Sequence, residues 1–194
     1  YCFFVDNGLL RPQDYTHIEV LKKQTPLNIE VIDAKELFFK KLKGISDPEL
    51  KRKAIGKTFI EVFEQKVKEF EKYNHINFEY LLQGTLYPDV IESLSPHKKG
   101  GKSATIKSHH NVGGLPERMN LKLLEPLKFL FKDEVRVLGE SVNLKHEWVH
   151  RHPFPGPGIG VRVLGELFPE SIKKVKDSDK IIFEELHNQN QYHA

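Results

Sequence analysis

The sequence predicts an α/β fold built on a parallel sheet. Short apolar runs rich in β-branched and aromatic residues alternate with segments of helical spacing. Residues 1–5 and 28–32 predict strands, and residues 13–24 and 34–43 predict helices. Strand, helix, strand, helix at these lengths is typical of βαβ units, whose strands lie parallel in one sheet.

The middle of the chain extends this alternation. The motif Ser46-Asp47-Pro48-Glu49 predicts a helix start, because Ser can cap, Pro fits the first turn and Glu completes a capping box. Apolar residues then recur at helical spacing, so we expect a helix over 47–73. Beyond it, we expect strands over 78–82 and 121–124 and a helix over 135–142.

A domain boundary is expected near residue 150. Residues 153–160 are rich in Pro and Gly and cannot form a helix interior. After them the sequence predicts a strand over 161–164 and a helix over 169–188. A single strand and helix cannot bury a core alone, so this segment must dock on the first domain or on further chain. We therefore expect domains at 1–150 and 151–194.

Composition narrows the function. The 194 residues carry a formal net charge of +3, which fits an anionic small molecule and is too weak and too scattered to indicate nucleic acid. The lone cysteine, Cys2, excludes an internal disulfide and a cysteine-based metal site. No apolar run has the length of a membrane span. These features predict a protein of the cytoplasm.

The segment Lys107–Gly114 is the most informative stretch and reads KSHHNVGG. Two imidazoles, an amine and a carboxamide on a loop with a Gly-Gly hinge suit a lid that closes over phosphates. A surface loop that happens to contain two histidines is an equally simple alternative. A zinc site is not expected, because no third and fourth ligands follow at suitable spacing.

A second motif, Gln83–Ser93, reads QGTLYPDVIES and follows a predicted strand. In open α/β sheets, ligands bind at that end of the strands. Asp89 and Glu92 share one helical face and suit Mg²⁺ with substrate phosphates, with Asp89 the better candidate. The alternative is an ordinary acidic first turn of a helix.

Two further segments carry basic side chains. The run Lys51-Arg52-Lys53 lies in the first turns of the long helix, where positive charge is unfavourable unless an anion is near. The alternative is a solvated basic face. The segment Arg151–Arg162 reads RHPFPGPGIGVR, and its Pro-Gly repeat makes a rigid wall that lets a ligand approach the backbone. The alternative is a linker.

Together these three motifs, in this order and spacing, resemble the synthetase half of the glutamine-hydrolysing GMP synthetases. The resemblance runs from Val5-Asp6-Asn7-Gly8 to about Arg162 and more weakly beyond. It implies an adenine-nucleotide alpha hydrolase-like (Rossmann-like) ATP pyrophosphatase domain, followed by the start of a small α+β dimerisation domain. The family's glutaminase domain, phosphate-binding loop and C-terminal tail have no counterpart in the sequence, so we expect both domains to be incomplete.

The resemblance also implies roles for individual residues. The catalytic group comprises Lys107, His109, His110, Asn111 and Asp89. Contacts to xanthosine monophosphate (XMP) are implied for Arg52, Arg151, Pro155, Gly156, Pro157 and Gly158. Contacts to ATP are implied for Phe4, Val5, Gly84, Thr85 and Asp89. Asp89 and Glu92 are the implied Mg²⁺ ligands.

The implied reaction is the ATP-dependent amination of XMP to GMP through an adenyl-XMP intermediate. Ammonia would come from glutamine hydrolysis in a partner domain or subunit, and the protein would be a homodimer. Two alternatives stay open: another ATP pyrophosphatase-type synthetase such as NAD synthetase, and a non-catalytic nucleotide-binding or assembly module. We expect the 194-residue chain alone to form no GMP.

Overall fold

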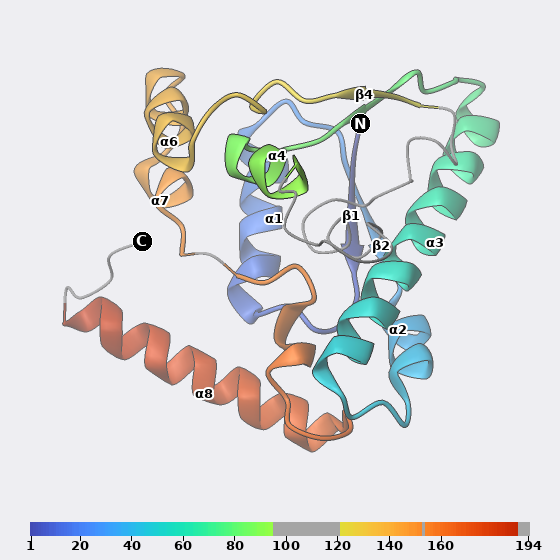
Figure 1. The fold of residues 1–194 in the computed structure, drawn as a ribbon, viewed down its shortest axis with the longest axis vertical. Coiled ribbons are helices and arrows are strands. Elements are labelled where there is room, and N and C mark those ends of the chain that lie inside the picture. The colour runs from blue at the N-terminus through green and yellow to red at the C-terminus, as the bar shows by residue number, and fades with distance from the viewer. Residues whose placement is uncertain (95–120, 153, 190–194) are drawn as a thin grey trace. The chain divides into compact units, whose positions relative to one another are not determined.

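The structure is a computed structural model that describes residues 1–94, 121–152 and 154–189 (Figure 1). The chain forms two compact units. Unit 1 comprises Tyr1–Lys68 and Pro153–His193, and unit 2 comprises Glu69–His152. None of the described helices combines the length and the apolar character needed to cross a membrane.

Unit 1 is built on a parallel pair of strands. The strand β1 (Cys2–Asp6) lies beside β2 (Ile29–Asp33), with Cys2 opposite Ile29 and Asp6 opposite Asp33. The helix α1 (Pro12–Gln24) connects them, and α2 (Lys35–Leu42) follows β2. All four elements were predicted to within two residues, so the expected βαβ connection with parallel strands is confirmed.

The long helix α3 (Pro48–Asn74) begins in unit 1 and matches the helix predicted over 47–73. Its first turn is capped by Asp47, whose carboxylate accepts the N–H of Leu50 at 2.8 Å, one residue after the predicted cap Ser46. The amphipathic spacing places Ile55 and Val62 in the core of unit 1, both less than a tenth exposed.

The core of unit 1 joins segments that are far apart in the sequence. Buried apolar side chains come from β1, the loop after it, α2, α3 and the chain beyond residue 153. They are Val5, Leu9, Ala34, Phe38, Leu42, Ile55, Val62, Ile159, Val163 and Ile172. The C-terminal segment therefore packs on residues 1–68, as expected for a segment too small to bury a core alone. The division into functional domains at residue 150 stays a prediction.

The strand predicted over 161–164 is wrong. Gly158–Val161 forms the short 3₁₀ helix η2, and the helix α8 (Pro169–Asn188) follows as predicted. The backbone groups of this segment make local and loop hydrogen bonds in place of a strand pairing. The Ile159 N–H donates to the Leu9 carbonyl at 2.8 Å, and the Val163 N–H donates to the Ile159 carbonyl at 3.3 Å. Val161 and Val163 alternate with polar or exposed residues as in a strand, but Val163 is buried because the chain turns there.

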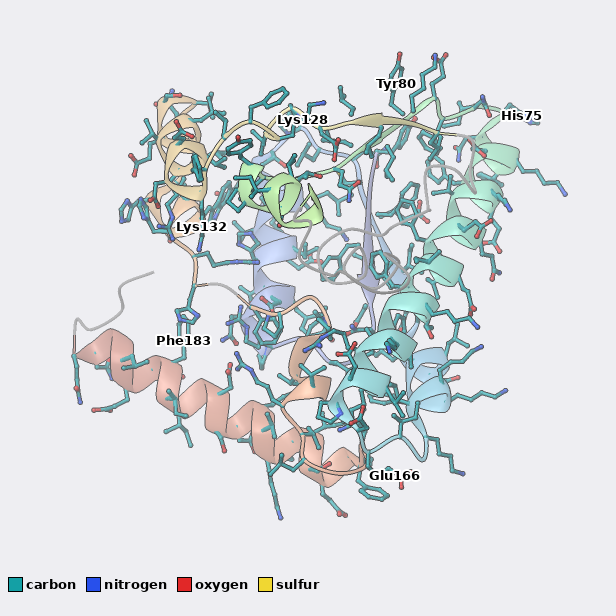
Figure 2. The ribbon with its side chains drawn as sticks, viewed as in Figure 1. His75, Tyr80, Lys128, Lys132, Glu166 and Phe183 are labelled. Carbon is teal, nitrogen blue, oxygen red and sulfur yellow. The ribbon has the colours of Figure 1, made fainter. Side chains whose placement is uncertain are left out.

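Unit 2 contains a second parallel pair, β3 (Tyr80–Leu82) beside β4 (Lys122–Leu124). The described part of this unit has the helices α4 (Tyr87–Leu94), α6 (Lys132–Ser141) and α7 (His146–Val149) after β3. Tyr80 of β3 is 54% exposed, and its position beside β4 is marked in Figure 2. The helix α6 begins three residues before the prediction, because the Glu134 carboxylate accepts the Phe131 N–H at 2.7 Å and caps it.

Candidate functional site

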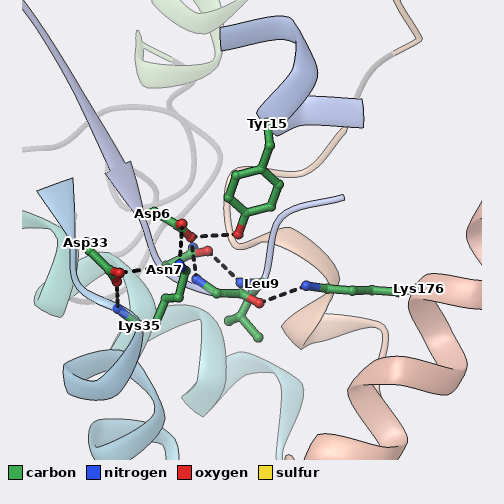
Figure 3. Close-up of polar contacts among 8 residues, drawn as sticks. Asp6, Asn7, Leu9, Tyr15, Asp33, Lys35 and Lys176 are labelled. Carbon is green, nitrogen blue, oxygen red and sulfur yellow. Dashed lines mark hydrogen bonds and ion pairs between the residues drawn. The ribbon is translucent and has the colours of Figure 1, made fainter. Parts of the chain in front are cut away.

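The carboxyl end of β1 holds a buried carboxylate with three donors around it (Figure 3). Asp6 is 3% exposed. Its Oδ1 accepts the Gly8 N–H at 2.9 Å and the Tyr15 hydroxyl at 2.7 Å, and its Oδ2 lies 3.0 Å from Nζ of Lys35. A buried charge needs such partners, so Asp6 is the organising group of this loop.

The protonation of this cluster follows from its contacts. Burial raises the pKa of Tyr15 far above its ordinary value of 10.0, and the hydrogen bond to Asp6 raises it further. The contact with Asp6 also raises the pKa of Lys35, and Asp33 adds to that effect. The Lys35 backbone N–H in turn holds the pKa of Asp33 below its ordinary range. The cluster therefore presents a fixed ammonium and a neutral phenol near pH 7.

A second amine reaches this loop from α8. Nζ of Lys176 donates to the Gly8 carbonyl at 3.1 Å, as Figure 3 shows. Burial lowers the pKa of Lys176, while the Asp6 carboxylate opposes that effect. The carboxyl end of β1, the edge where ligands bind in open α/β sheets, thus carries two amines within unit 1. Sequence analysis missed Lys35, Tyr15 and Lys176, although Lys35 follows a strand end and was recognisable on that ground.

Phe4 and Val5, the implied ATP contacts, lie in β1. The Val5 side chain is 7% exposed and belongs to the core, and Phe4 is half-buried. Among the described strands β1 pairs with β2 alone. Their contact with ATP stays a prediction.

The Pro-Gly segment packs against the loop after β1. Gly158 is buried with a φ of +69°, and a Cβ there would lie 2.3 Å from the Leu9 carbonyl oxygen. Gly156 is exposed, and a Cβ there would meet nothing within 4 Å. The two glycines thus differ: Gly158 is required by the fold, and Gly156 is open to a ligand. Pro155 and Pro157 are half-buried beside them.

Two arginines stack on the aromatic residue of the same segment. The Arg11 guanidinium lies 4.0 Å from the Phe154 ring centroid, and that of Arg162 lies 5.2 Å from it. Arg11 also pairs with Asp14 at 3.0 Å. These cation–π contacts fix Phe154 in place, which a flexible linker would not do. Arg151, the other arginine of the motif, is exposed and lies in unit 2.

The basic run at the start of α3 divides into different environments. Lys51 is fully buried, and its Nζ donates to the Val163 carbonyl at 2.7 Å. Burial lowers the pKa of Lys51. Arg52, the implied XMP contact, is half-buried and pairs with Glu49 one turn earlier. Sequence analysis missed the structural role of Lys51, although it shares a helical face with Ile55.

The carboxyl ends of β3 and β4 in unit 2 bring together Thr85 and Glu125. Thr85 is 5% exposed, and its hydroxyl donates to Oε1 of Glu125 at 2.5 Å. Gly84 beside it is exposed, with open space where a Cβ would lie. Sequence analysis missed Glu125, which directly follows β4 and was recognisable by that position.

Asp89 lies in the first turn of α4. Its Oδ2 accepts the Leu86 N–H at 2.8 Å, so the carboxylate caps the helix as the structural alternative predicted. Its second oxygen has no hydrogen-bond partner among the described residues and suits Mg²⁺, which takes few protein carboxylates. The side chain of Glu92 lies outside the described part of the chain. So do Lys107, His109, His110 and Asn111, whose roles stay predictions.

Comparison with known proteins identifies the relatives of this sequence. No family model matches the chain. It is 53% identical over 189 residues to a protein of Helicobacter pylori named GMP synthase [glutamine-hydrolyzing], and 54% identical over 187 residues to one of Elusimicrobium minutum with the same name. The chain is similar to a part of these glutamine-hydrolysing GMP synthases.

The match covers 97% of this chain and 36% of the Helicobacter pylori GMP synthase, so the chain spans about a third of that relative's length. A GMP synthase of Helicobacter acinonychis shares 53% identity over the same extent. The resemblance inferred from the three motifs is confirmed. The α/β architecture with parallel strands agrees with the fold that this resemblance implied.

Proposed function

We propose that this chain is part of the synthetase that converts XMP to GMP with ATP and ammonia. The observation that carries the proposal is the 53% identity to GMP synthase over 97% of the chain, which includes all three motifs. The protein would be a ligase of purine biosynthesis. Its cytoplasmic location and its assembly as a homodimer belong to the same proposal.

In the first step the C2 oxygen of XMP attacks the α-phosphorus of ATP. The bond between the α-phosphorus and the bridging oxygen breaks, and pyrophosphate leaves with the bonding electrons. Negative charge grows on pyrophosphate as the bond breaks. Cationic groups that bind this charge more strongly in the transition state than in the ground state therefore accelerate the step. Lys107 would supply such a charge, with His109, His110 and Asn111 as hydrogen-bond partners.

In the second step ammonia attacks C2 of adenyl-XMP. The C2–oxygen bond breaks, AMP leaves with that oxygen, and the nitrogen loses a proton to give GMP. Ammonia would come from glutamine hydrolysis by a partner domain or subunit, which agrees with the printed name of the relatives. Because ammonia is a small neutral nucleophile, holding adenyl-XMP in reach accounts for much of the rate.

Several described contacts support nucleotide binding. Lys35 of α2 and Lys176 of α8 contact the carboxyl end of β1 and the loop after it. The loop after β3 carries Gly84 and Thr85. Both places are strand ends, where α/β proteins bind ligands. Thr85 is held by Glu125, which would orient the backbone at Gly84 for close approach by a phosphate.

The proposed metal is Mg²⁺, held by Asp89 through its second oxygen and by Glu92. Bound Mg²⁺ supplies neutralisation of charge on the β- and γ-phosphates. Asp89 would have two functions in this proposal, since its other oxygen caps α4. The Leu86 N–H bond fixes the rotamer of the carboxylate and so places the second oxygen.

The proposal is tested by XMP-dependent exchange of labelled pyrophosphate into ATP, with the full-length product of the reading frame that encodes this chain. We expect exchange that needs XMP and falls about 100-fold or more in Lys107→Ala, as is typical when one transition-state contact is lost. Lys72→Ala, at an exposed lysine near the end of α3, is the matched control and should keep full exchange.

Exchange supported by another acid, such as the nicotinate-bearing substrate of NAD synthetase, and not by XMP would replace this proposal with another ATP pyrophosphatase-type synthetase. Absence of exchange with any acid, together with retained Mg-ATP binding, would favour the non-catalytic alternative. Equal exchange by Lys107→Ala and the unaltered protein would remove Lys107 from the chemistry.

A further inference from the structure

In unit 2 the helices α6 and α7 are held close together by a tight turn. Asn143 in that turn adopts a φ of 59°, and the Leu144 N–H donates to the Gly139 carbonyl at 3.0 Å. Gly139 is buried, and a Cβ there would lie only 3.1 Å from Cγ2 of Val149. The absence of a side chain at Gly139 therefore lets α7 pack directly on the last turns of α6.

This packing brings three potential metal ligands to one point. Glu140 is the neighbour of Gly139 in α6, and His146 and His150 lie one helical turn apart along α7 and its end. Oε1 of Glu140 lies 2.8 Å from Nε2 of His150 and 3.6 Å from Nδ1 of His146. The two imidazole rings stack, with centroids 4.1 Å apart and planes inclined by 30°.

The geometry suits a tetrahedral metal ion. Zn²⁺ binds nitrogen and oxygen ligands at about 2.0–2.2 Å, which places ligand atoms of one tetrahedron roughly 3.3 Å apart. The two distances from Glu140 fall on either side of that value, and all three ligand atoms lie within 4.8 Å of one another. Small rotations about side-chain bonds would bring them to a common ion.

The donor set selects the class of metal. Two imidazole nitrogens with one carboxylate oxygen are a common three-ligand zinc set, with water at the fourth position. Mg²⁺ and Ca²⁺ favour all-oxygen surroundings, so this cluster differs from the proposed Mg²⁺ ligands of the synthetase reaction. The side chains are 49%, 80% and 34% exposed for Glu140, His146 and His150, so an ion can enter from solvent.

We propose that Glu140, His146 and His150 form a zinc-binding site that clamps α7 to α6. The short α7, a single turn of four residues, gains most from such a clamp because a helix of that length is not stable alone. The proposal is independent of the synthetase reaction, since none of these residues belongs to the candidate catalytic or substrate-binding set.

The test uses the full-length protein after removal of metal by a chelator, and Zn²⁺ itself as the probe. Zn²⁺ affinity and stoichiometry are measured by competition with a chromophoric zinc indicator in the unaltered protein, His146→Asn and His150→Asn. We expect each variant to lose one equivalent of Zn²⁺, or to bind it more weakly by more than the roughly 10- to 100-fold that loss of an outer-shell partner costs. Co²⁺ in place of Zn²⁺ should give the intense visible absorption of a tetrahedral site, and the variants should lose it.

The matched control is His75→Asn. His75 is exposed, directly follows α3 in unit 2 and adopts a φ of 55°, which asparagine tolerates (Figure 2). We expect this variant to bind Zn²⁺ as the unaltered protein does, and Zn²⁺ to raise its Tm equally. Unchanged binding in His146→Asn and His150→Asn would overturn the site, as would no Zn²⁺ binding by the unaltered protein. A loss in His75→Asn as large as in His146→Asn would overturn it too.

Discussion

Replacement of Gly158 by alanine should destabilise the protein through a collision that side-chain rotation cannot relieve. At a φ of +69° the new Cβ would lie 2.3 Å from the Leu9 carbonyl oxygen and 2.9 Å from its carbon. Both are backbone atoms, so the chain itself must move. That movement breaks the bond from the Ile159 N–H to the Leu9 carbonyl, now 2.8 Å long and buried.

The cost can be summed from its parts. The left-handed backbone costs a non-glycine residue about 1–2 kcal/mol. A buried donor or acceptor left without its partner costs about 1–3 kcal/mol. We therefore expect Gly158→Ala to lower the free energy of unfolding by about 2–5 kcal/mol.

Two other glycines separate these contributions. Gly165 has a φ of +74° but open space where a Cβ would lie, so Gly165→Ala should show only the backbone cost of about 1–2 kcal/mol. Gly56 lies within α3 with open space around it, so Gly56→Ala should gain about 0.5–1 kcal/mol from helix propensity. Urea unfolding, followed by circular dichroism, gives all three free energies.

The order Gly56→Ala, Gly165→Ala, Gly158→Ala in decreasing stability is the expected outcome. If Gly158→Ala were as stable as Gly165→Ala, the close contact between residue 158 and Leu9 would be absent. That result would contradict the packing of η2 on the loop after β1. Gly156→Ala completes the series: it should leave stability unchanged, so any loss of XMP affinity there reports on binding alone.

Three hydrogen-bonded polar side chains should also contribute measurably to stability. The pKa of Tyr15 is raised in the folded state, so its hydroxyl stays protonated there at pH values where the unfolded chain would lose the proton. The contribution of Tyr15 to the free energy of unfolding is therefore fully present below pH 10.0 and is lost as the pH rises further. Tyr15→Phe should flatten this loss, measured by urea unfolding at successive pH values. Lys51→Ala should cost about 1–3 kcal/mol in unfolding free energy because it leaves a buried carbonyl without its donor, whereas Lys53→Ala, at an exposed site, should stay within about 0.5 kcal/mol. Thr85→Val should cost about 1.5–3 kcal/mol by removing a hydrogen bond to a carboxylate, and exposed Thr16→Val should not; equal losses in the two threonine variants would contradict the Thr85 contact.

The sequence was sufficient where one physical signal dominated. The Ser-Asp-Pro-Glu motif and the apolar spacing after it located α3, and the apolar runs at 1–5 and 28–32 located the parallel pair β1 and β2. The segment 161–164 was misjudged because alternating valines look alike in a strand and in a turn that buries every second residue. Only the contact with Leu9, more than 140 residues earlier in the chain, decides between them.

The candidate site was predicted less completely, because motifs name the residues near a ligand and not those that hold the loops. Asp89 and Thr85 were recognised from their motif, but Glu125, which binds Thr85, follows a strand 40 residues later. Lys176 reaches the loop after β1 from α8, and no local pattern records such a long-range approach. A search for polar residues just after each predicted strand would have identified Glu125 and Lys35.

The measurement that tests the central claim most directly follows the C2 oxygen of XMP. XMP labelled with ¹⁸O at C2 is incubated with ATP, ammonium and the full-length protein, and the products are separated for mass spectrometry. Amination through adenyl-XMP predicts that the label appears in the phosphate of AMP, with pyrophosphate unlabelled. Label in inorganic phosphate accompanied by ADP, or label found only in water or unreacted XMP, would contradict the proposed function.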